Sequence, residues 1–184
     1  ALGANFTFAS ASIIYRLYSG MLGVFHVNWI KSLVALIAFA ATLALLGLYS
    51  QPRVDFIWPL LLSGAIGLGL GDLCLLKGFV LIGPGRSMSL FGFQPFIVSF
   101  FAFAFYGQRL SWEQVLGVFV MMLALLVFTL ERLDRSRSVQ AKGLMFAFLG
   151  MFLDTAGILL TREAFEVHPQ MHSLEANLYR SAGA

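Results

Sequence analysis

The sequence predicts an all-α membrane protein, a polytopic bundle of transmembrane helices. Of its 184 residues, 59% are hydrophobic and 11% are charged, and the mean hydropathy is +0.86. A soluble domain has about a quarter of its residues charged, so this chain lacks the polar surface that would cover a soluble core. Apolar runs approaching the ~20 residues that cross a bilayer recur along the chain. We therefore expect about six to seven spans.

The charge and cysteine content narrow the functional classes. The formal net charge is +3, but basic residues of membrane proteins usually lie in loops and set topology, so we expect no nucleic-acid partner. The single cysteine, Cys74, cannot form an internal disulfide and is expected to pack as a small apolar residue. No cluster of His, Cys or Asp residues has metal- or diphosphate-binding spacing, so we expect neither a metal nor another cofactor.

The first two spans are expected at Leu2–Tyr18 and at about Ile30–Leu48. The first is short for a span and has no initiator methionine, so we expect the start of this helix to be missing. Trp29 and Lys31 introduce the second span and are residue types that suit a membrane interface.

The third span is expected from about Phe56 to Ile82, which is ~39 Å of helix and long enough to cross with a tilt. Glycines at 64, 67 and 71 share one face, with Asp72 at its edge. Such a small-residue face lets another helix approach closely, and a carboxylate in lipid is costly unless it faces the protein or water. Lys77 lies five residues further on, too far to pair with Asp72 within the helix, and is expected to extend to the interface.

The fourth span follows a tight Gly83-Pro84-Gly85 turn and is expected from Ser87 to Tyr106. Pro95 at its centre removes one backbone donor, so we expect a kink. Gln94 and several phenylalanines surround this kink. Apolar walls with a few placed polar groups are typical of a pocket for a small amphipathic solute.

The fifth span is expected from Ser111, where Ser111 and Gln114 form a capping-box pattern, to about Leu130. The sixth is expected at about Leu144–Thr161. It places Asp154 on one face with Gly150, Gly157 and Thr161. A buried carboxylate on such a face is a candidate proton carrier at a helix interface or cavity.

The two ends of the chain form an internal repeat. Ile13–Arg16 (IIYR) corresponds to Leu159–Arg162 (LLTR), and Asn28–Ser32 (NWIKS) to Asn177–Ser181 (NLYRS). Five spans separate the copies, so they have opposite orientations, as in the inverted repeats of secondary transporters. We expect a first repeat at 1–130, a polar linker at 131–142 and the beginning of a second repeat at 143–184.

These features together resemble the EamA-type family of the drug/metabolite transporter superfamily. The resemblance rests on an ordered series of short motifs: Gly71-Asp72, Gly78, Gly83, Arg86-Ser87, Pro95 and Tyr106–Ser111 (YGQRLS). Gln108 stands where the family usually has glutamate, and Gly78 where it usually has alanine. The resemblance implies a ten-helix permease for small metabolites such as amino acids, often an exporter.

Charge bias predicts the orientation. One side has Arg16, Lys31, Lys77, Arg86, Arg132, Arg135, Arg137 and Lys142, and the other has Arg53, Arg109, Arg162 and Arg180. The first side should be cytoplasmic, which puts the linker inside. The family resemblance implies the opposite placement of the linker, and a missing or extra N-terminal span would reconcile the two.

The leading hypothesis is a secondary transporter in the cell membrane, not an enzyme, which exposes a central cavity alternately to each side of the bilayer. The cavity candidates are Asp72, Gln94, Pro95 and Asp154, and the expected partners are a small solute, lipid and a proton as coupling ion. Alternatives are a structural membrane subunit, an inactive truncated fragment, or a membrane-embedded lipid-modifying enzyme. A homodimer is a further arrangement, since a half with little of its inverted partner needs another chain to close a pathway.

Overall fold

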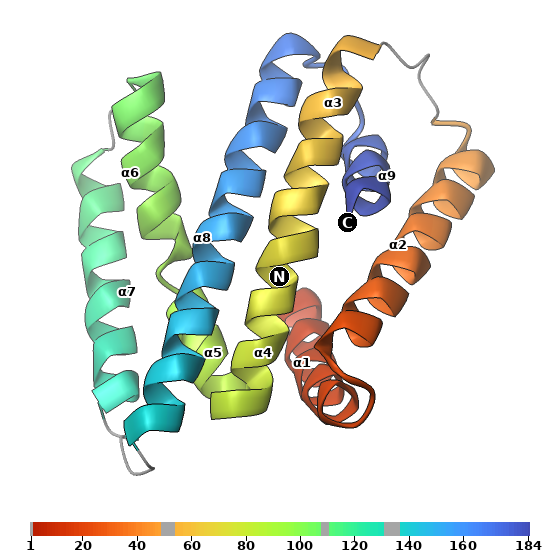
Figure 1. Cartoon of the computed structure of the whole chain (residues 1–184). Coiled ribbons are helices and arrows are strands. Elements are labelled where there is room, and N and C mark those ends of the chain that lie inside the picture. Colours follow the sequence, from red (N-terminus) through yellow and green to blue (C-terminus); the bar gives the residue numbers. More distant parts are fainter. Residues whose placement is uncertain (1, 49–53, 108–110, 131–136) are drawn as a thin grey trace.

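The computed structural model describes residues 2–48, 54–107, 111–130 and 137–184, and all regular structure in these ranges is helical, as predicted (Figure 1). The helices are α1 (Leu2–Leu22), α2 (Val24–Leu46), α3 (Val54–Ser63), the π-helix η1 (Gly64–Gly71), α4 (Asp72–Ile82), α5 (Pro84–Phe91), α6 (Gln94–Tyr106), α7 (Trp112–Leu130), α8 (Arg137–Val167) and α9 (Ser173–Gly183).

Three helical stretches within the described ranges are long and apolar enough to cross a membrane. They are Val24–Leu46, Ile57–Ile82 and Val139–Val167. The second runs through α3, η1 and α4 without a break, as expected for the third span. The larger number of spans expected from the sequence stays a prediction.

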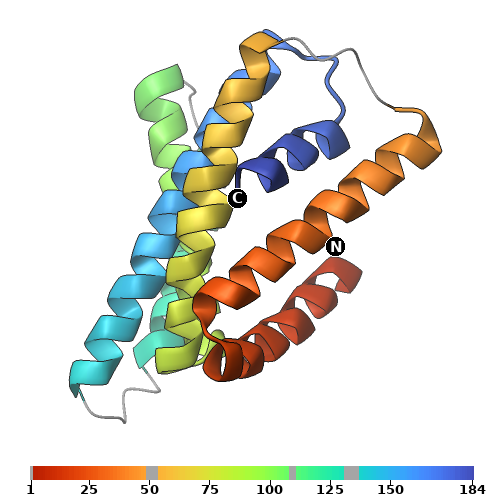
Figure 2. The ribbon, with the colours of Figure 1, turned by 45° about the vertical axis from the view of Figure 1, so that its right-hand side comes forward.

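The continuous rod α3–η1–α4 packs along α8 and forms the centre of the bundle (Figures 1 and 2). Helices α6 and α7 lie on one side of α8, and α1 and α2 lie on the other side of the rod (Figure 1). The short helix α9 lies between the rod and α2 and contacts both (Figure 2). Segments from both ends of the chain therefore meet at the middle of the bundle.

Glycines bring the central rod and α8 to backbone contact. A methyl group on Gly157 would lie 2.9 Å from the carbonyl oxygen of Ser63 and 3.1 Å from the Cα of Gly67. At the same contact, Ser63 Oγ donates a hydrogen bond to the carbonyl oxygen of Gly157 over 2.6 Å. The two small-residue faces that the sequence predicts thus pack against each other.

The π-helix in the rod was not predicted, because the sequence indicated one continuous α-helix. Four of its eight residues are glycine, each of which lowers α-helix stability by about 0.5–1 kcal/mol relative to alanine. The wider winding leaves carbonyl groups to satisfy, and Asn28 Nδ2 on α2 donates to the carbonyl oxygens of Leu68 and Gly69 over 3.1 and 3.2 Å. A polar side chain of a neighbouring helix therefore supports the irregular turn.

The fourth expected span is broken rather than kinked. Helix α5 ends at Phe91 and α6 begins at Gln94, with Gly92 and Phe93 between them. Pro95 lies in the first turn of α6, where its missing N–H removes no helical hydrogen bond. Glycine at the end of one helix and proline at the start of the next explain why the chain separates into two helices here.

The start of α5 differs from the prediction, and the start of α7 agrees with it. Helix α5 begins at Pro84, before the expected Ser87, so Pro84 and Gly85 of the expected turn are helical and only Gly83, with a φ of 88°, separates α4 from α5. Proline suits the first position of a helix, which explains the earlier start. Ahead of α7, the backbone N–H of Ser111 donates to Gln114 Oε1 over 3.0 Å, and the N–H of Gln114 donates to Ser111 Oγ over 3.3 Å. These reciprocal bonds confirm the predicted capping box.

The sixth span begins earlier than expected. Helix α8 starts at Arg137, so residues 137–142, which we expected in the linker, are helical. Packing explains the extension, because Gly143 of α8 lies so close to Ile82 that a side chain there would overlap Ile82 Cγ2. Residues 131–136 of the expected linker, and residues 108–110 of the family motif, lie outside the described residues.

Candidate functional site

Five polar side chains from five helices meet near the middle of the bundle. They are Lys31 of α2, Asp72 of α4, Gln94 of α6, Asp154 of α8 and Arg180 of α9, and we call them the central charge cluster. Asp154 lies about halfway along the apolar stretch Val139–Val167. Ionisable groups at such depth are costly in lipid and usually mark the path of a solute or ion.

The first contact of the cluster is an ion pair between Lys31 and Asp72. It joins α2 to the junction of η1 and α4. The two side chains are only 21% and 18% exposed. Because Asp72 would otherwise lie unpaired inside an apolar span, Lys31 neutralises a charge that lipid would not tolerate.

The second carboxylate, Asp154, has two partners. Gln94 Nε2 donates to Asp154 Oδ2 over 2.6 Å, and Arg180 Nη2 lies 3.9 Å from Asp154 Oδ1. Gly67 makes room for this arrangement, since a methyl group there would lie 3.3 Å from Asp154 Oδ1 and 3.5 Å from Arg180 Nη2. The small residue thus allows two charged side chains to lie against the backbone of η1.

Arg180 retains unused hydrogen-bonding capacity. Its side chain is 12% exposed, and within the described part of the chain its Nε is buried without a hydrogen-bond partner. The 3.9 Å separation between Arg180 Nη2 and Asp154 Oδ1 is longer than a hydrogen bond, so the two side chains form an ion pair but no hydrogen bond at these atoms. A guanidinium in this state presents donors to any acceptor that enters beside it.

The cluster is balanced in charge. Two carboxylates face two cations, and Asp72 interacts electrostatically with Asp154 and Arg180 as well as with Lys31. Such a site offers the paired N–H donors of a guanidinium, in Arg180, next to an acceptor, the carboxylate of Asp154. In the described ranges, no group of three or more His, Cys, Asp and Glu side chains is arranged to hold a metal ion.

The structure brings three of the four residues expected in the cavity into this cluster and leaves one outside. Gln94 and Asp154 are hydrogen-bonded to each other. Gly71, which precedes Asp72 in the chain, packs against the backbone of Asp154, since a methyl group on Gly71 would lie 3.2 Å from the Asp154 nitrogen. Pro95 has an exposed side chain in the first turn of α6. The break between α5 and α6 lies directly before Gln94 and Pro95.

Sequence reasoning missed Lys31 and Arg180. It assigned both to the membrane surface as determinants of topology, on opposite sides, because each lies near the expected start of an apolar segment. One signal could have identified them: the internal repeat aligns Lys31 in NWIKS with Arg180 in NLYRS. A cation at the same position of both copies indicates a shared role in the fold rather than two independent loop charges.

Comparison of this sequence with known families, curated proteins and solved structures identifies the family of the chain. No curated protein and no solved structure gives a significant match. The model of the EamA-like transporter family matches residues 1–130, which is more than half of the chain and includes Lys31, Asp72 and Gln94 of the cluster. This match confirms the resemblance indicated by the motifs. The chain therefore belongs to the EamA-like transporter family and is an integral membrane protein.

Proposed function

We propose that this member of the drug/metabolite transporter superfamily carries a small zwitterionic metabolite, with amino acids as the simplest class, across the cell membrane. The single observation that supports the substrate class is the state of Arg180: its buried Nε has no hydrogen-bond partner among the described residues, and its Nη2 lies 3.9 Å from Asp154. A carboxylate and an ammonium group on one solute would satisfy both residues.

The binding step follows from hydrogen-bond chemistry. The solute carboxylate accepts from the guanidinium of Arg180, which favours two parallel bonds to such a group. The solute ammonium donates to Asp154, in the place of the long contact with Arg180. Because the solute and the cluster are each close to neutral, binding would leave no net charge within the bilayer.

The transport step rests on the inverted repeat. The site joins helices from the first repeat to α8 and α9 of the second, so movement of one repeat against the other would open it to each side in turn. We propose that Asp154 carries the coupling proton, because it is the carboxylate whose ion-pair partner changes when the solute carboxylate binds Arg180. It releases its proton to water on the side where the solute ammonium binds it, and it takes a proton from water on the other side after the solute has left.

Transport by the full-length protein in proteoliposomes tests the substrate class. Uptake is measured for an amino acid, for the amine that lacks its carboxylate and for the carboxylic acid that lacks its ammonium group. The wild type should prefer the amino acid, and Arg180→Gln should reduce its uptake about tenfold or more, since a charged hydrogen bond is lost. Arg180→Lys keeps the charge but not the fork and should retain part of the uptake.

Arg162→Gln is the matched control, because Arg162 pairs with Glu166 on the surface of α8, outside the cluster. It should transport like the wild type. Wild-type uptake of the amino acid by Arg180→Gln would refute the proposed binding mode. For the proton, Asp154→Asn should abolish uptake driven by a pH gradient, and unchanged flux would remove Asp154 from the coupling step.

A further inference from the structure

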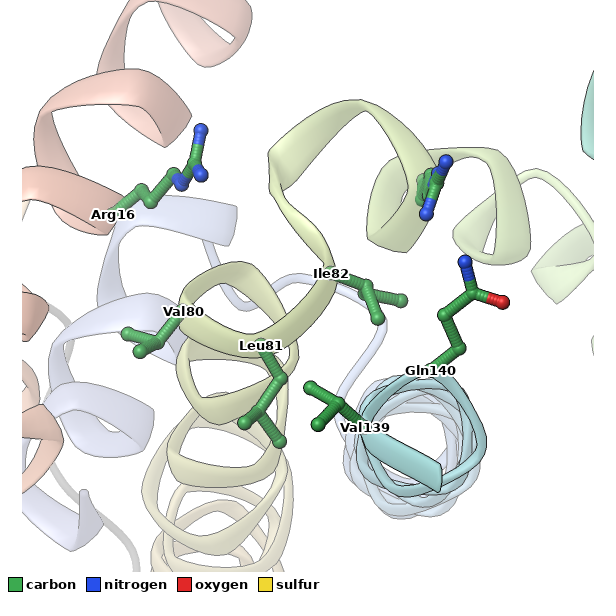
Figure 3. A pocket seen from close by; sticks show the side chains of 7 residues that line it. Arg16, Val80, Leu81, Ile82, Val139 and Gln140 are labelled. Carbon is green, nitrogen blue, oxygen red and sulfur yellow. The ribbon is translucent and has the colours of Figure 1, made fainter. Parts of the chain in front are cut away.

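The two ends of α8 differ in whether they carry a group that titrates near neutral pH. At its start, α8 lines a cavity of about 320 Å³ together with α1, α4 and α5, and Figure 3 shows Arg16 and Gln140 on opposite sides of it. The residues that line this cavity are arginines, one glutamine and aliphatic residues, and these types do not change charge between about pH 5 and 8. Beyond the other end of α8, the loop to α9 contains His168 and His172, and histidine ordinarily changes charge in that range.

His172 caps the N-terminus of α9. The backbone N–H of Leu174 donates a hydrogen bond to Nδ1 of His172 over 3.2 Å, and the backbone of His172 is extended, with a φ of −73° and a ψ of 139°. An imidazole nitrogen that accepts a hydrogen bond carries no proton, so this cap needs the neutral ring with its proton on Nε2. Most N-caps are Ser, Thr, Asp or Asn, whose oxygens still accept near neutral pH. The cap of α9 is therefore one that acid can remove.

Protonation of His172 would weaken α9 in two ways. A proton on Nδ1 removes the acceptor for the N–H of Leu174, and the positive ring then lies at a helix N-terminus, where the helix dipole favours negative charge. His172 is exposed and lies five residues beyond the apolar stretch Val139–Val167, so water supplies the proton. Helix α9 has only 11 residues, a length at which a helix in water is marginal without packing. The stabilisation by the cap is thus present at neutral and alkaline pH and is lost as the pH falls.

Helix α9 connects this cap to the central charge cluster, because it carries Arg180. Figure 2 shows α9 running from the loop toward the rod. A methyl group on Gly64 of η1 would overlap the carbonyl group of Arg180, and one on Gly183 would overlap the carbonyl group of Leu61. Such close contacts form only while α9 is helical and packed on the rod. The position of Arg180 therefore depends on the stability of α9 as a whole, to which the cap contributes.

Other titratable or charged residues belong to α9, to the loop, to the end of α8 and to the elements packed against α9. They are His26 and Lys31 of α2, Asp55 of α3, Arg162, Glu163 and Glu166 of α8, His168 of the loop, and Glu175, Tyr179 and Arg180 of α9. Carboxylic acids ordinarily titrate below about pH 5, and the phenol, amine and guanidinium groups above about pH 9. By residue type, His26 and His168 are thus the residues that an experiment must separate from His172.

We propose that His172 is a pH-sensitive cap of α9. When the water on its side of the membrane becomes acidic, the ring takes up a proton and the cap is lost. Helix α9 then leaves the rod for a larger fraction of the time, and Arg180 leaves the cluster with it. The consequence for transport rests on the function proposed above, in which Arg180 binds the solute carboxylate, whereas the opening of α9 does not.

Hydrogen exchange of the backbone amides of α9 measures this opening in the purified full-length protein without a solute. Protection factors, which correct for the intrinsic effect of pH on exchange, are compared at pH 8 and pH 5.5. In the wild type, the amides from Leu174 to Arg180 should be about fivefold less protected at pH 5.5, because an N-cap contributes ~1 kcal/mol. Since no solute is present, a wrong substrate class would leave this result unchanged.

Two variants at position 172 and one control assign the effect. His172→Asn provides a cap that accepts at both pH values, so α9 should keep its protection at pH 5.5 although His168 is still present. His172→Phe has no acceptor and should show the lower protection at both pH values. His26→Gln is the matched control, because His26 is an exposed histidine near the start of α2, and α9 should then depend on pH as in the wild type.

The proposal is overturned if α9 of the wild type is equally protected at both pH values, or if His172→Asn loses as much protection in acid as the wild type. A loss confined to the first turn of α9, with the amide of Arg180 still protected, would overturn the link between the cap and the cluster.

Discussion

The ion pair between Lys31 and Asp72 gives the sharpest test of how the bundle tolerates charge. Lys31→Met or Asp72→Asn alone leaves the other charge without its partner, with side chains that are 21% and 18% exposed in the native structure. Breaking a buried pair costs 3–5 kcal/mol, and the remaining exposure places each single variant near the lower end, about 3 kcal/mol. The double variant removes both charges and should cost only about 1 kcal/mol, since a neutral pair needs no compensation.

Thermal unfolding in detergent measures this coupling. At about 2–4 °C per kcal/mol for a chain of this size, each single variant should lower the Tm by about 6–12 °C and the double variant by about 2–4 °C. Lys77→Met is the matched control, because Lys77 is an exposed lysine on α4, close in sequence to Asp72 but outside the pair, and it should change the Tm little. If the losses of the single variants simply add in the double variant, the two residues are not coupled and the reasoning about charge in this bundle fails.

Three further sets of variants test the packing, the π-helix and a helix start. Gly157→Ala should lower the free energy of unfolding by about 1–3 kcal/mol, because its methyl group would lie 2.9 Å from a carbonyl oxygen. Gly117→Ala is the control, since Gly117 has open space around it, and it should be neutral or stabilising. Denaturant titration of both variants measures the difference. Asn28→Leu should cost about 1–3 kcal/mol and speed hydrogen exchange in η1, since two carbonyl groups lose their donor; unchanged exchange would contradict its role there. Ser111→Ala and Gln114→Ala should each lower the free energy of unfolding by about 1 kcal/mol, because each removes one of the two reciprocal bonds of the capping box. If only one of the two variants is less stable than the wild type, the capping box is contradicted.

The sequence predicted the structure correctly where a residue pattern is compatible with one local structure. Apolar runs predicted helices, and the Ser111 and Gln114 pair predicted the start of α7. The expected turn at Gly83-Pro84-Gly85 marked the break between α4 and α5, although only Gly83 is outside both helices. The small residues on the third and sixth spans predicted a close contact, and Gly157 makes it. These features depend on local geometry, which the sequence carries directly.

The features that the sequence did not predict depend on which helices pack against each other in the folded chain. Lys31 is equally suited to an interface or to an ion pair, and only the packing of α2 against the central rod decides between them. The π-helix depends on Asn28, which is about forty positions away in the sequence and supplies donors that an isolated glycine-rich segment would lack. Pro95 was expected at the cavity because a kink was expected there, but the chain breaks before Gln94 and the Pro95 side chain is exposed.

The π-helix also sets the rotational register of the span that contains it. The N–H of Asp72 bonds to the carbonyl oxygen of Gly67, five residues before it, rather than to the fourth as in an α-helix. Rewinding this segment by one residue would turn everything after it by about 100°, the angle that one α-helical residue spans. Asp72 would then swing away from Lys31 while Ser63, before the segment, kept its bond to α8. A small exchange of backbone hydrogen bonds in η1 would thus break the ion pair between Lys31 and Asp72 while α3 stayed attached to α8 through Ser63.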